Sequence, residues 1–292
     1  MKTFLHSFLM GMAAVMLISL VSCNEKKEPA NQGGNNPTED TTPGTTPDTT
    51  PDDKDGSHST PPPAIVVDNC GNKYGWVQIG DQYWMTENMR CNLYGSKSGW
   101  TGGDLKTSVV ITFAPFYTNA SNKSNWYTNK FAEDLSADQI AKLGYLYNWA
   151  AAMAIATETD AKSQTSDFND KRQGICPDGW HVPTNKEWIT LKNFIEKTDG
   201  KGEKSAGKHL KSRSGWYQNG NGDNHYSFAA LPASFADKGN SICWVGQDAG
   251  FWTTAVRNAN EAFIAQIGYL DNELSFAVPN KSRAFSVRCV WD

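Results

Sequence analysis

A run of fifteen residues at positions 174–188, GICPDGWHVPTNKEW, constrains the fold of this chain more than any other segment. Its PDG tripeptide (177–179) has the composition of a tight turn. Thr184 and Glu187 then form a T-x-x-E pattern, in which each side chain satisfies a free backbone amide at a helix start. The run therefore predicts a turn followed by a helix that begins near Asn185.

The residues after this start repeat at helical spacing. Trp188, Leu191 and Ile195 lie on one face of a helix, and the Asp-Gly pair at 199–200 supplies a stop signal. An apolar stripe of this kind must pack against another element. The segment predicts a helix that covers part of a core.

The first residues are typical of a bacterial export signal. Lys2 supplies a positive start, residues 4–20 are apolar, and residues 20–23 (LVSC) resemble a lipobox. We expect a signal peptide over 1–22 and lipidation of Cys23, which would anchor the protein in the cell envelope, in the outer membrane and exposed at the surface. A plain signal peptide or a short membrane anchor is the alternative.

Residues 23–63 are rich in Pro and Thr and have almost no apolar residues, which predicts a disordered tether. At about 3.1 Å per residue in polyproline II, this tether could reach on the order of 120 Å. The DTT triplets at 40–42 and 48–50 resemble an O-glycosylation sequon of exported bacterial proteins, and an unmodified linker is the alternative. Residues 64–292 remain as one folded head.

The composition excludes one class of partner. The formal charge is −4, and no run rich in Lys and Arg is present, whereas nucleic-acid binding needs a basic stripe. Aromatic residues make up 12% of the chain, with 11 tryptophans, which suits a secreted globular head. We expect no nucleic-acid partner.

The head opens with a predicted hairpin. Residues 76–79 and 82–85 alternate as strands, and the Gly-Asp pair at 80–81 forms the turn. Centring that turn pairs residues whose numbers sum to 161, and Cys70 and Cys91 satisfy this sum. A disulfide between them is expected if the backbones stay within about 7 Å.

The middle of the chain contains weaker signals. We expect a short strand over 109–113 and a capped helix over 136–143. Asn148 can cap a buried helix that begins at Trp149. Residues 200–284 mix glycine, asparagine and aromatic residues without a helical period, which favours short strands and long ordered loops.

The last residues predict a strand with one face in the core, beside the first strand of the head. One face carries Phe285, Val287, Cys289 and Trp291, and the other carries Ser286, Arg288 and Val290.

Together these segments resemble the Fibrobacter succinogenes major paralogous domain, a family of exported bacterial modules that is related to the C-type lectin fold. The resemblance covers most of 64–292. Its motifs lie at 71–90, 144–153, 174–188, 227–235, 250–254 and 285–292.

The resemblance implies an α+β, C-type lectin-like head with paired N- and C-terminal strands, two main helices and a long-loop region. The chain departs from the family at two positions: Ser234 replaces a usual glycine, and Cys70 replaces a usual acidic residue. These departures concern loop details.

Five cysteines remain if Cys23 is lipidated. Cys176 and Cys289 lie in family motifs on elements expected to meet, which implies a second disulfide. With the 70–91 pair, this leaves Cys243 free. Buried thiols are the alternative, and we expect no metal site because no CxxC or His/Cys cluster exists.

No catalytic set can be assembled from the sequence, so we expect that the head is not an enzyme. Its histidines are His181, His209 and His225, and His181 is expected to be a packed, hydrogen-bonded ring. Residues 182–188 (VPTNKEW) resemble a motif of formylglycine-generating oxidases, a remote alternative. Those enzymes use a close cysteine pair late in the chain, and the late cysteines here are far apart.

Calcium-dependent sugar binding is an alternative function for this fold. Our main expectation is that the chain binds no cofactor. The lectin Glu-Pro-Asn motif is Val-Pro-Asn here, ending at Asn280, without its acid. Other oxygen donors that could form a calcium loop are Asp223, Asp271, Asn272 and Glu273, and ordinary solvated turns are the alternative.

Loop aromatics are the better binding candidates. Trp216, Tyr217 and Trp244 lie in predicted loops, where exposed rings could stack on sugars or anchor a protein partner. Burial of these rings is the alternative.

The leading hypothesis is a surface-presented lipoprotein with a non-catalytic, lectin-like head that binds extracellular glycan or polymer. A structural or adhesive module that binds surface proteins is the second.

Overall fold

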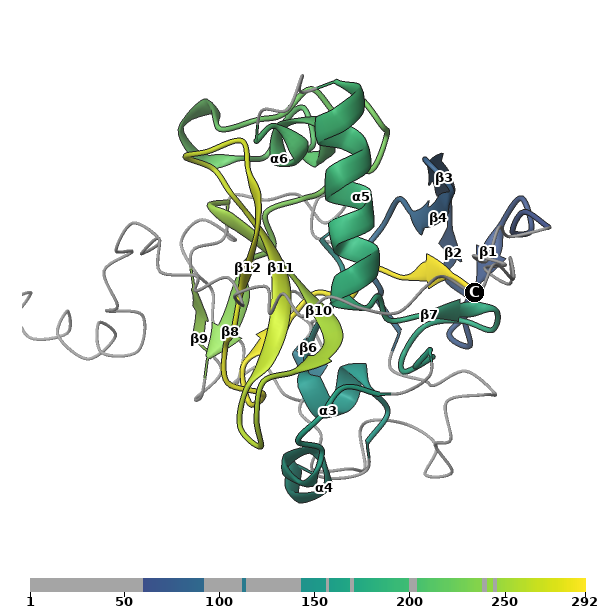
Figure 1. Ribbon diagram of the computed structural model, residues 1–292, viewed down its shortest axis with the longest axis vertical. Helices are drawn as coiled ribbons and strands as arrows, with labels where there is room; N and C mark the ends of the chain where they lie inside the picture. The colour runs from purple at the N-terminus through teal and green to yellow at the C-terminus, as the bar shows by residue number, and fades with distance from the viewer. Residues whose placement is uncertain are drawn as a thin grey trace, which may run out of the picture. The chain divides into compact units, whose positions relative to one another are not determined.

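The computed structural model shows a mixture of helices and small sheets in a unit that spans His58–Asp292, which confirms the α+β class (Figure 1). Predictions for the signal peptide, Cys23, most of the tether, the 136–143 helix, the Cys243 side chain and Trp244 fall outside the residues described. The structure describes residues 60–91, 112–113, 143–155, 158–168, 171–199, 204–237, 241–243 and 246–292.

The opening hairpin is formed as predicted. Strand β3 (Trp76–Ile79) pairs with β4 (Gln82–Met85), and each pair of partners, such as Trp76 and Met85, sums to 161. The disulfide between Cys70 and Cys91 is present, with their Cα atoms 5.6 Å apart. A short two-stranded sheet precedes it, made of β1 (Val66–Val67) and β2 (Lys73–Tyr74).

The C-terminal strand joins the same sheet at a different place from the one predicted. Strand β14 (Val290–Trp291) pairs with β4 and with β7 (Trp180–His181), so the sheet order is β3-β4-β14-β7. The prediction of pairing with the first strand is wrong. The second disulfide, Cys176–Cys289, is confirmed and ties the entry of β14 to the segment before β7, which favours a position between β4 and β7.

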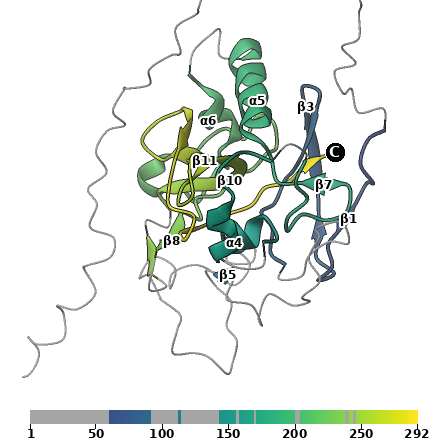
Figure 2. The same cartoon turned by 60° about the horizontal axis from the view of Figure 1, so that its bottom comes forward.

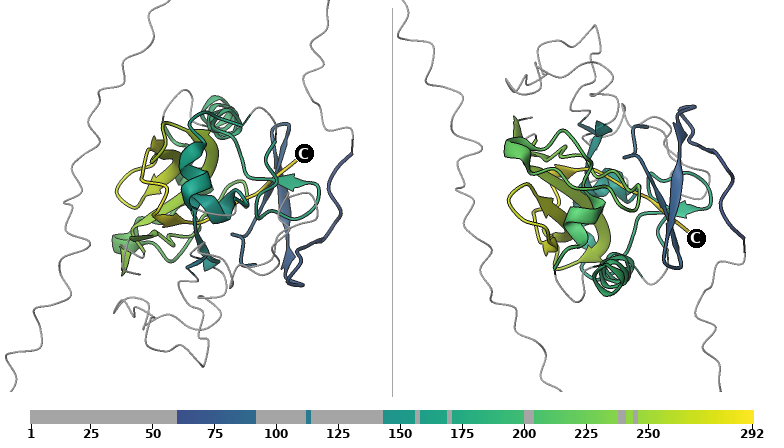
Figure 3. Two further views of the ribbon diagram at one scale, coloured as in Figure 1. Left: turned by 90° about the horizontal axis from the view of Figure 1, so that it is seen from below. Right: turned by 90° about the horizontal axis from the view of Figure 1, so that it is seen from above.

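The predicted final strand is split between two sheets. Strand β13 (Ala284–Phe285) pairs with β6 and β8, whereas β14 lies in the hairpin sheet. Both faces of this segment are buried, including Ser286 and Arg288 at 1% exposure. Figure 3 shows the yellow C-terminal segment crossing from the green sheet region to the blue hairpin. The prediction of one continuous strand with a single buried face is therefore wrong.

The central sheet has the order β5-β6-β13-β8-β9. Strand β5 lies within the predicted 109–113 segment. Asn148 caps α3 as predicted, since its side chain accepts a hydrogen bond from the N–H of Ala151 at 2.8 Å. The remaining elements here are β5 (Thr112–Phe113), β6 (Leu146–Asn148), α3 (Trp149–Ala152), α4 (Glu158–Ser163), β8 (Phe235–Asp237) and β9 (Ser241–Cys243).

A three-stranded meander occupies much of the region that was expected to hold short strands and loops. It consists of β10 (Asp248–Val256), β11 (Ala262–Gly268) and β12 (Leu274–Ala277). Every residue of β10 is buried, so the strand lacks the alternation that identifies a half-exposed strand.

Helix α5 (Asn185–Thr198) runs beside β10 and β11 (Figure 2). Its predicted stripe of Trp188, Leu191 and Ile195 is fully buried. The Trp188 ring lies 4.6 Å from Trp84 and 5.4 Å from Phe251, between centroids. This helix therefore joins the hairpin to the meander.

The helix inventory differs from the expected pair of main helices. Within the described ranges, α5 is the only helix longer than six residues, and α3, α4 and α6 (Ala206–Leu210) are short. A 3₁₀ turn follows at Tyr217–Asn219. No described helix combines the length and apolarity needed to cross a bilayer.

Candidate functional site

Backbone strain is concentrated in one segment, residues 211–234, which we call the strained loop. Among the described non-glycine residues, seven have a positive φ, and all but Ala154 lie in this loop. The six are Gln218, Asn219, Asn224, Ser227, Ala229 and Ser234. Each such residue costs about 1–3 kcal/mol, less for asparagine, and strain of this kind clusters at binding and active sites. The strained loop is therefore a candidate binding site.

A buried lysine fixes the start of the loop. Lys211 is 1% exposed, and its Nζ donates to the carbonyl of Asp271 at 2.8 Å and that of Gly268 at 3.3 Å. Burial lowers the pKa of Lys211, and the charge of Asp271 partly opposes this effect. The ammonium thus attaches the strained loop to the turn between β11 and β12.

Trp216 does not present an exposed ring. Its side chain is 5% exposed, and its Nε1 donates to Ser212 Oγ at 3.1 Å and to the carbonyl of Ala230 at 3.2 Å. The prediction of a stacking surface at Trp216 is wrong, because the ring closes the core beneath the loop. The Lys211 ammonium lies 5.3 Å from its centroid.

Tyr217 does point outward and meets a partner that the sequence did not identify. It is 39% exposed, and its ring contacts the edge of Tyr269 at 5.4 Å between centroids. Leu270, next to Tyr269, is 68% exposed. We call Tyr217, Tyr269 and Leu270 the aromatic platform. In the sequence, Tyr269 and Leu270 are two large residues that directly precede a polar stretch, and this contrast could have indicated the platform.

The backbone holds the aromatic platform in place. The N–H of Tyr217 donates to the carbonyl of Gly246 at 2.7 Å, and that of Tyr269 donates to Gln247 at 2.8 Å. Gly220 packs against Tyr269 so closely that an added Cβ would lie 2.3 Å from the Tyr269 carbonyl oxygen. Only glycine fits there, so the two loops approach in a fixed arrangement.

A second group of polar side chains lies around His209 of α6, and we call it the histidine cluster: Asp199, His209, Asp223, His225 and Tyr226. His209 Nδ1 lies 2.9 Å from Asp223 Oδ2, and the His209 and His225 rings are 5.8 Å apart. His225 Nε2 lies 3.9 Å from Asp199 Oδ2. Tyr226 donates its hydroxyl to Asp199, and burial together with this bond raises the pKa of Tyr226.

The oxygen donors considered for calcium do not converge in the described part of the chain. Lys208 lies between two of them, since its N–H donates to the carbonyl of Asn272 and its carbonyl accepts from Asp223. Glu273 pairs with lysines 192 and 204 at 3.3 Å, and Asp271 Oδ1 accepts the N–H of Glu273. These carboxylates serve contacts within the protein.

Asn280 is separate from the other predicted residues. It bridges to Glu261, before the start of β11, whereas the aromatic platform lies after the end of β11. The seven residues of β11 therefore separate the two places, a distance of about 23 Å at 3.3 Å per residue.

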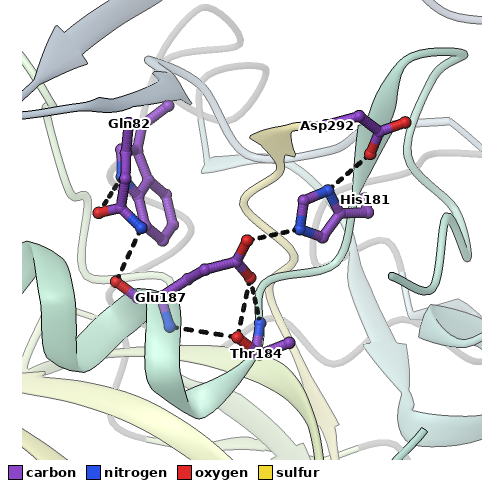
Figure 4. A network of polar contacts seen from close by, with 6 residues as sticks. Gln82, His181, Thr184, Glu187 and Asp292 are labelled. Carbon is purple, nitrogen blue, oxygen red and sulfur yellow. Dashed lines mark hydrogen bonds and ion pairs between the residues drawn. The ribbon is translucent and has the colours of Figure 1, made fainter. Parts of the chain in front are cut away.

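His181 is a packed ring, as expected (Figure 4). It is 1% exposed, with Nδ1 at 2.7 Å from Asp292 and Nε2 at 2.8 Å from Glu187. Burial acts to lower the pKa of His181, but the hydrogen bonds to Asp292 and Glu187 outweigh it and raise the pKa. Both nitrogens are occupied, so this ring links the C-terminal strand to the start of α5.

Asp68, Cys70 and Cys91 bring possible metal ligands within 4.8 Å of one another. The two sulfurs form a disulfide and cannot act as thiolates. Asp68 instead accepts the hydroxyl of Tyr74 at 2.6 Å. This group is a structural clasp at the base of the hairpin.

The family model of the Fibrobacter succinogenes major domain matches residues 77–291. No curated protein and no solved structure matched the chain.

Proposed function

This chain belongs to the Fibrobacter succinogenes major domain family, and we propose that its head is a non-catalytic, C-type lectin-like binding module for extracellular glycan or polymer. A lipid on Cys23 would hold this module at the bacterial surface.

The observation that carries the proposal is the aromatic platform. Large rings prefer burial, and here Tyr217 is exposed on a strained loop whose backbone is fixed by hydrogen bonds. Rings held in one orientation can stack on a sugar face without losing much conformational entropy on binding. Gln218 and Asn219 are exposed beside them and offer amide groups to hydroxyls.

The contacts of the cysteines and of His181 favour binding over oxidation or proton transfer. Cys289 is one of the late cysteines that a formylglycine-generating oxidase would use, and it is bonded to Cys176. His181 has carboxylates on both nitrogens, so it would have to break a contact before acting as a base.

A protein ligand is the second candidate, and Leu270 favours it. An aliphatic side chain that is 68% exposed beside two tyrosines has the composition of a protein-binding anchor. The head would then serve an adhesive or structural role at the cell surface.

The test is binding of the purified full-length protein to arrayed glycans and to immobilised polysaccharides. Tyr217→Ala and Tyr269→Ala should each weaken binding by about tenfold or more, about 1.4 kcal/mol. Tyr83→Ala is the matched control, because Tyr83 forms an edge contact with Trp76 at 5.2 Å in the hairpin sheet. Its glycan affinity should equal that of the wild type.

Two results would contradict the glycan proposal. One is the absence of any bound glycan, together with capture of a surface protein that depends on Leu270. The other is glycan binding that neither tyrosine substitution changes.

A further inference from the structure

We propose that the histidine cluster binds one borderline transition-metal ion, represented by Zn²⁺, through His209, His225 and Asp199. This inference does not depend on the aromatic platform or on its ligand.

The environment of His209 is that of a metal ligand. Its Nδ1 contacts both carboxylate oxygens of Asp223, at 2.9 and 3.1 Å. In the neutral ring, this contact places the proton on Nδ1 and leaves the lone pair on Nε2. Metal-binding histidines commonly have this arrangement, in which a carboxylate orients the ring and raises its basicity.

The spacing of the two rings fits one shared ion. With Zn–N bonds of about 2.0–2.1 Å, two imidazoles on one Zn²⁺ have centroids roughly 5–6 Å apart. The His209 and His225 centroids are 5.8 Å apart. His225 Nε2 is also 3.9 Å from Asp199 Oδ2, longer than the roughly 3.3 Å between two donors on one tetrahedral Zn²⁺, so a small movement of the exposed ring would be needed.

Closing the site around an ion requires side-chain movement. The three donor atoms are not yet within 4.8 Å of one another. His225 has a side chain that is 58% exposed, so it can change rotamer without disturbing the core. Asp199 is held by Tyr226 and His209 by Asp223, so two of the three ligands are already oriented.

The donor set selects the metal. Two imidazole nitrogens and one carboxylate suit Zn²⁺ and related ions, whereas Ca²⁺ takes six to eight oxygens. Three protein ligands would leave a fourth position for water or for a group from a bound molecule.

The experiment is calorimetric titration of the purified full-length protein with Zn²⁺, and optical titration with Co²⁺. We expect one ion per chain. His209→Ala and His225→Ala should each weaken Zn²⁺ binding at least tenfold, and Asp223→Asn should weaken it by about 10–100-fold without removing a ligand. His58→Ala, which changes a histidine outside the cluster, should leave the affinity unchanged.

Folding of each variant is checked by circular dichroism, and His225→Ala is the decisive variant because its exposed side chain adds little to the core. The proposal is overturned if the protein binds no Zn²⁺, or if His225→Ala binds it as tightly as the wild type. Thiolate charge-transfer bands with Co²⁺ would also overturn it, because they would place the ion on a cysteine.

Discussion

Arg288 is a fully buried arginine that connects three segments far apart in the chain. Its Nη1 donates to the carbonyls of Met85 and Phe228, at 3.1 and 2.5 Å, and its Nε and Nη2 donate to Asn88 Oδ1. Burial lowers the pKa of Arg288 to about 9. Its partners are neutral oxygens, so the guanidinium is stabilised by hydrogen bonds and by the Phe228 ring at 4.5 Å.

His181 makes stability depend on pH. Its pKa is raised in the folded state, so its contribution is complete below about pH 6.5 and is lost as the pH rises through the folded-state pKa. Burial acts to raise the pKa of Glu187, but its contacts with His181 lower it overall, so its contribution is lost as the pH falls below about 4.5. The network should stabilise most between about pH 4.5 and 6.5.

The prediction is tested with His181→Gln, which cannot become charged. At about pH 6 the substitution should lower the free energy of unfolding by about 2–3 kcal/mol. This is a low value for the loss of two charged hydrogen bonds, because Asp292 is 46% exposed and solvent weakens its contact. Urea unfolding at several pH values should show this difference shrinking as the pH rises above about 6.5. A difference that stays constant up to about pH 9 would show that His181 is uncharged throughout.

At the scale of elements, the start of α5 is set by its cap. Thr184 Oγ1 accepts the N–H of Glu187 at 3.1 Å, and Glu187 Oε2 accepts the N–H of Thr184 at 2.8 Å. Thr184→Ala should reduce the free energy of unfolding by about 1 kcal/mol. Thr190→Ala, an exposed substitution within the same helix, should be neutral or slightly stabilising, because alanine has the higher helix propensity. If Thr184→Ala and Thr190→Ala lower the free energy of unfolding in denaturant equally, the cap has no specific role.

The elements that the sequence predicted well have local signals. The capping box, the Gly-Asp turn and the Asn148 cap each depend on a few adjacent residues, and each formed as expected. Strand β10 was missed because both of its faces are buried, and α6 because five residues carry too little periodicity.

The candidate site was only partly predictable for the same reason. Tyr217 and Asp223 lie in a loop whose composition indicated a binding region. Burial of Trp216 depends on Ser212 and Ala230, and the partial exposure of Tyr269 depends on the β11–β12 turn, which local patterns do not specify.

At the scale of the whole head, its first and last described residues meet at the hairpin sheet. Trp291 Nε1 donates to the carbonyl of Thr60 at 3.2 Å, and Trp76 Nε1 donates to that of Pro63 at 2.7 Å. Contacts that join the ends of a unit close large loops, which costs conformational entropy. A disulfide across such a loop lowers this cost, because it restricts the unfolded chain.

The two disulfides allow this to be measured. Cys176–Cys289 spans 113 residues and Cys70–Cys91 spans 21. The chain-entropy relation gives about 4.8 kcal/mol for the longer loop and about 3.3 kcal/mol for the shorter one. Replacing each pair by alanine, which leaves no free thiol at either site, should therefore cost about 1.5 kcal/mol more for the 176–289 pair.

The measurement is the free energy of unfolding in urea for both double variants. If the 70–91 variant loses as much or more, the length of the closed loop does not set the stability that each disulfide adds to the head.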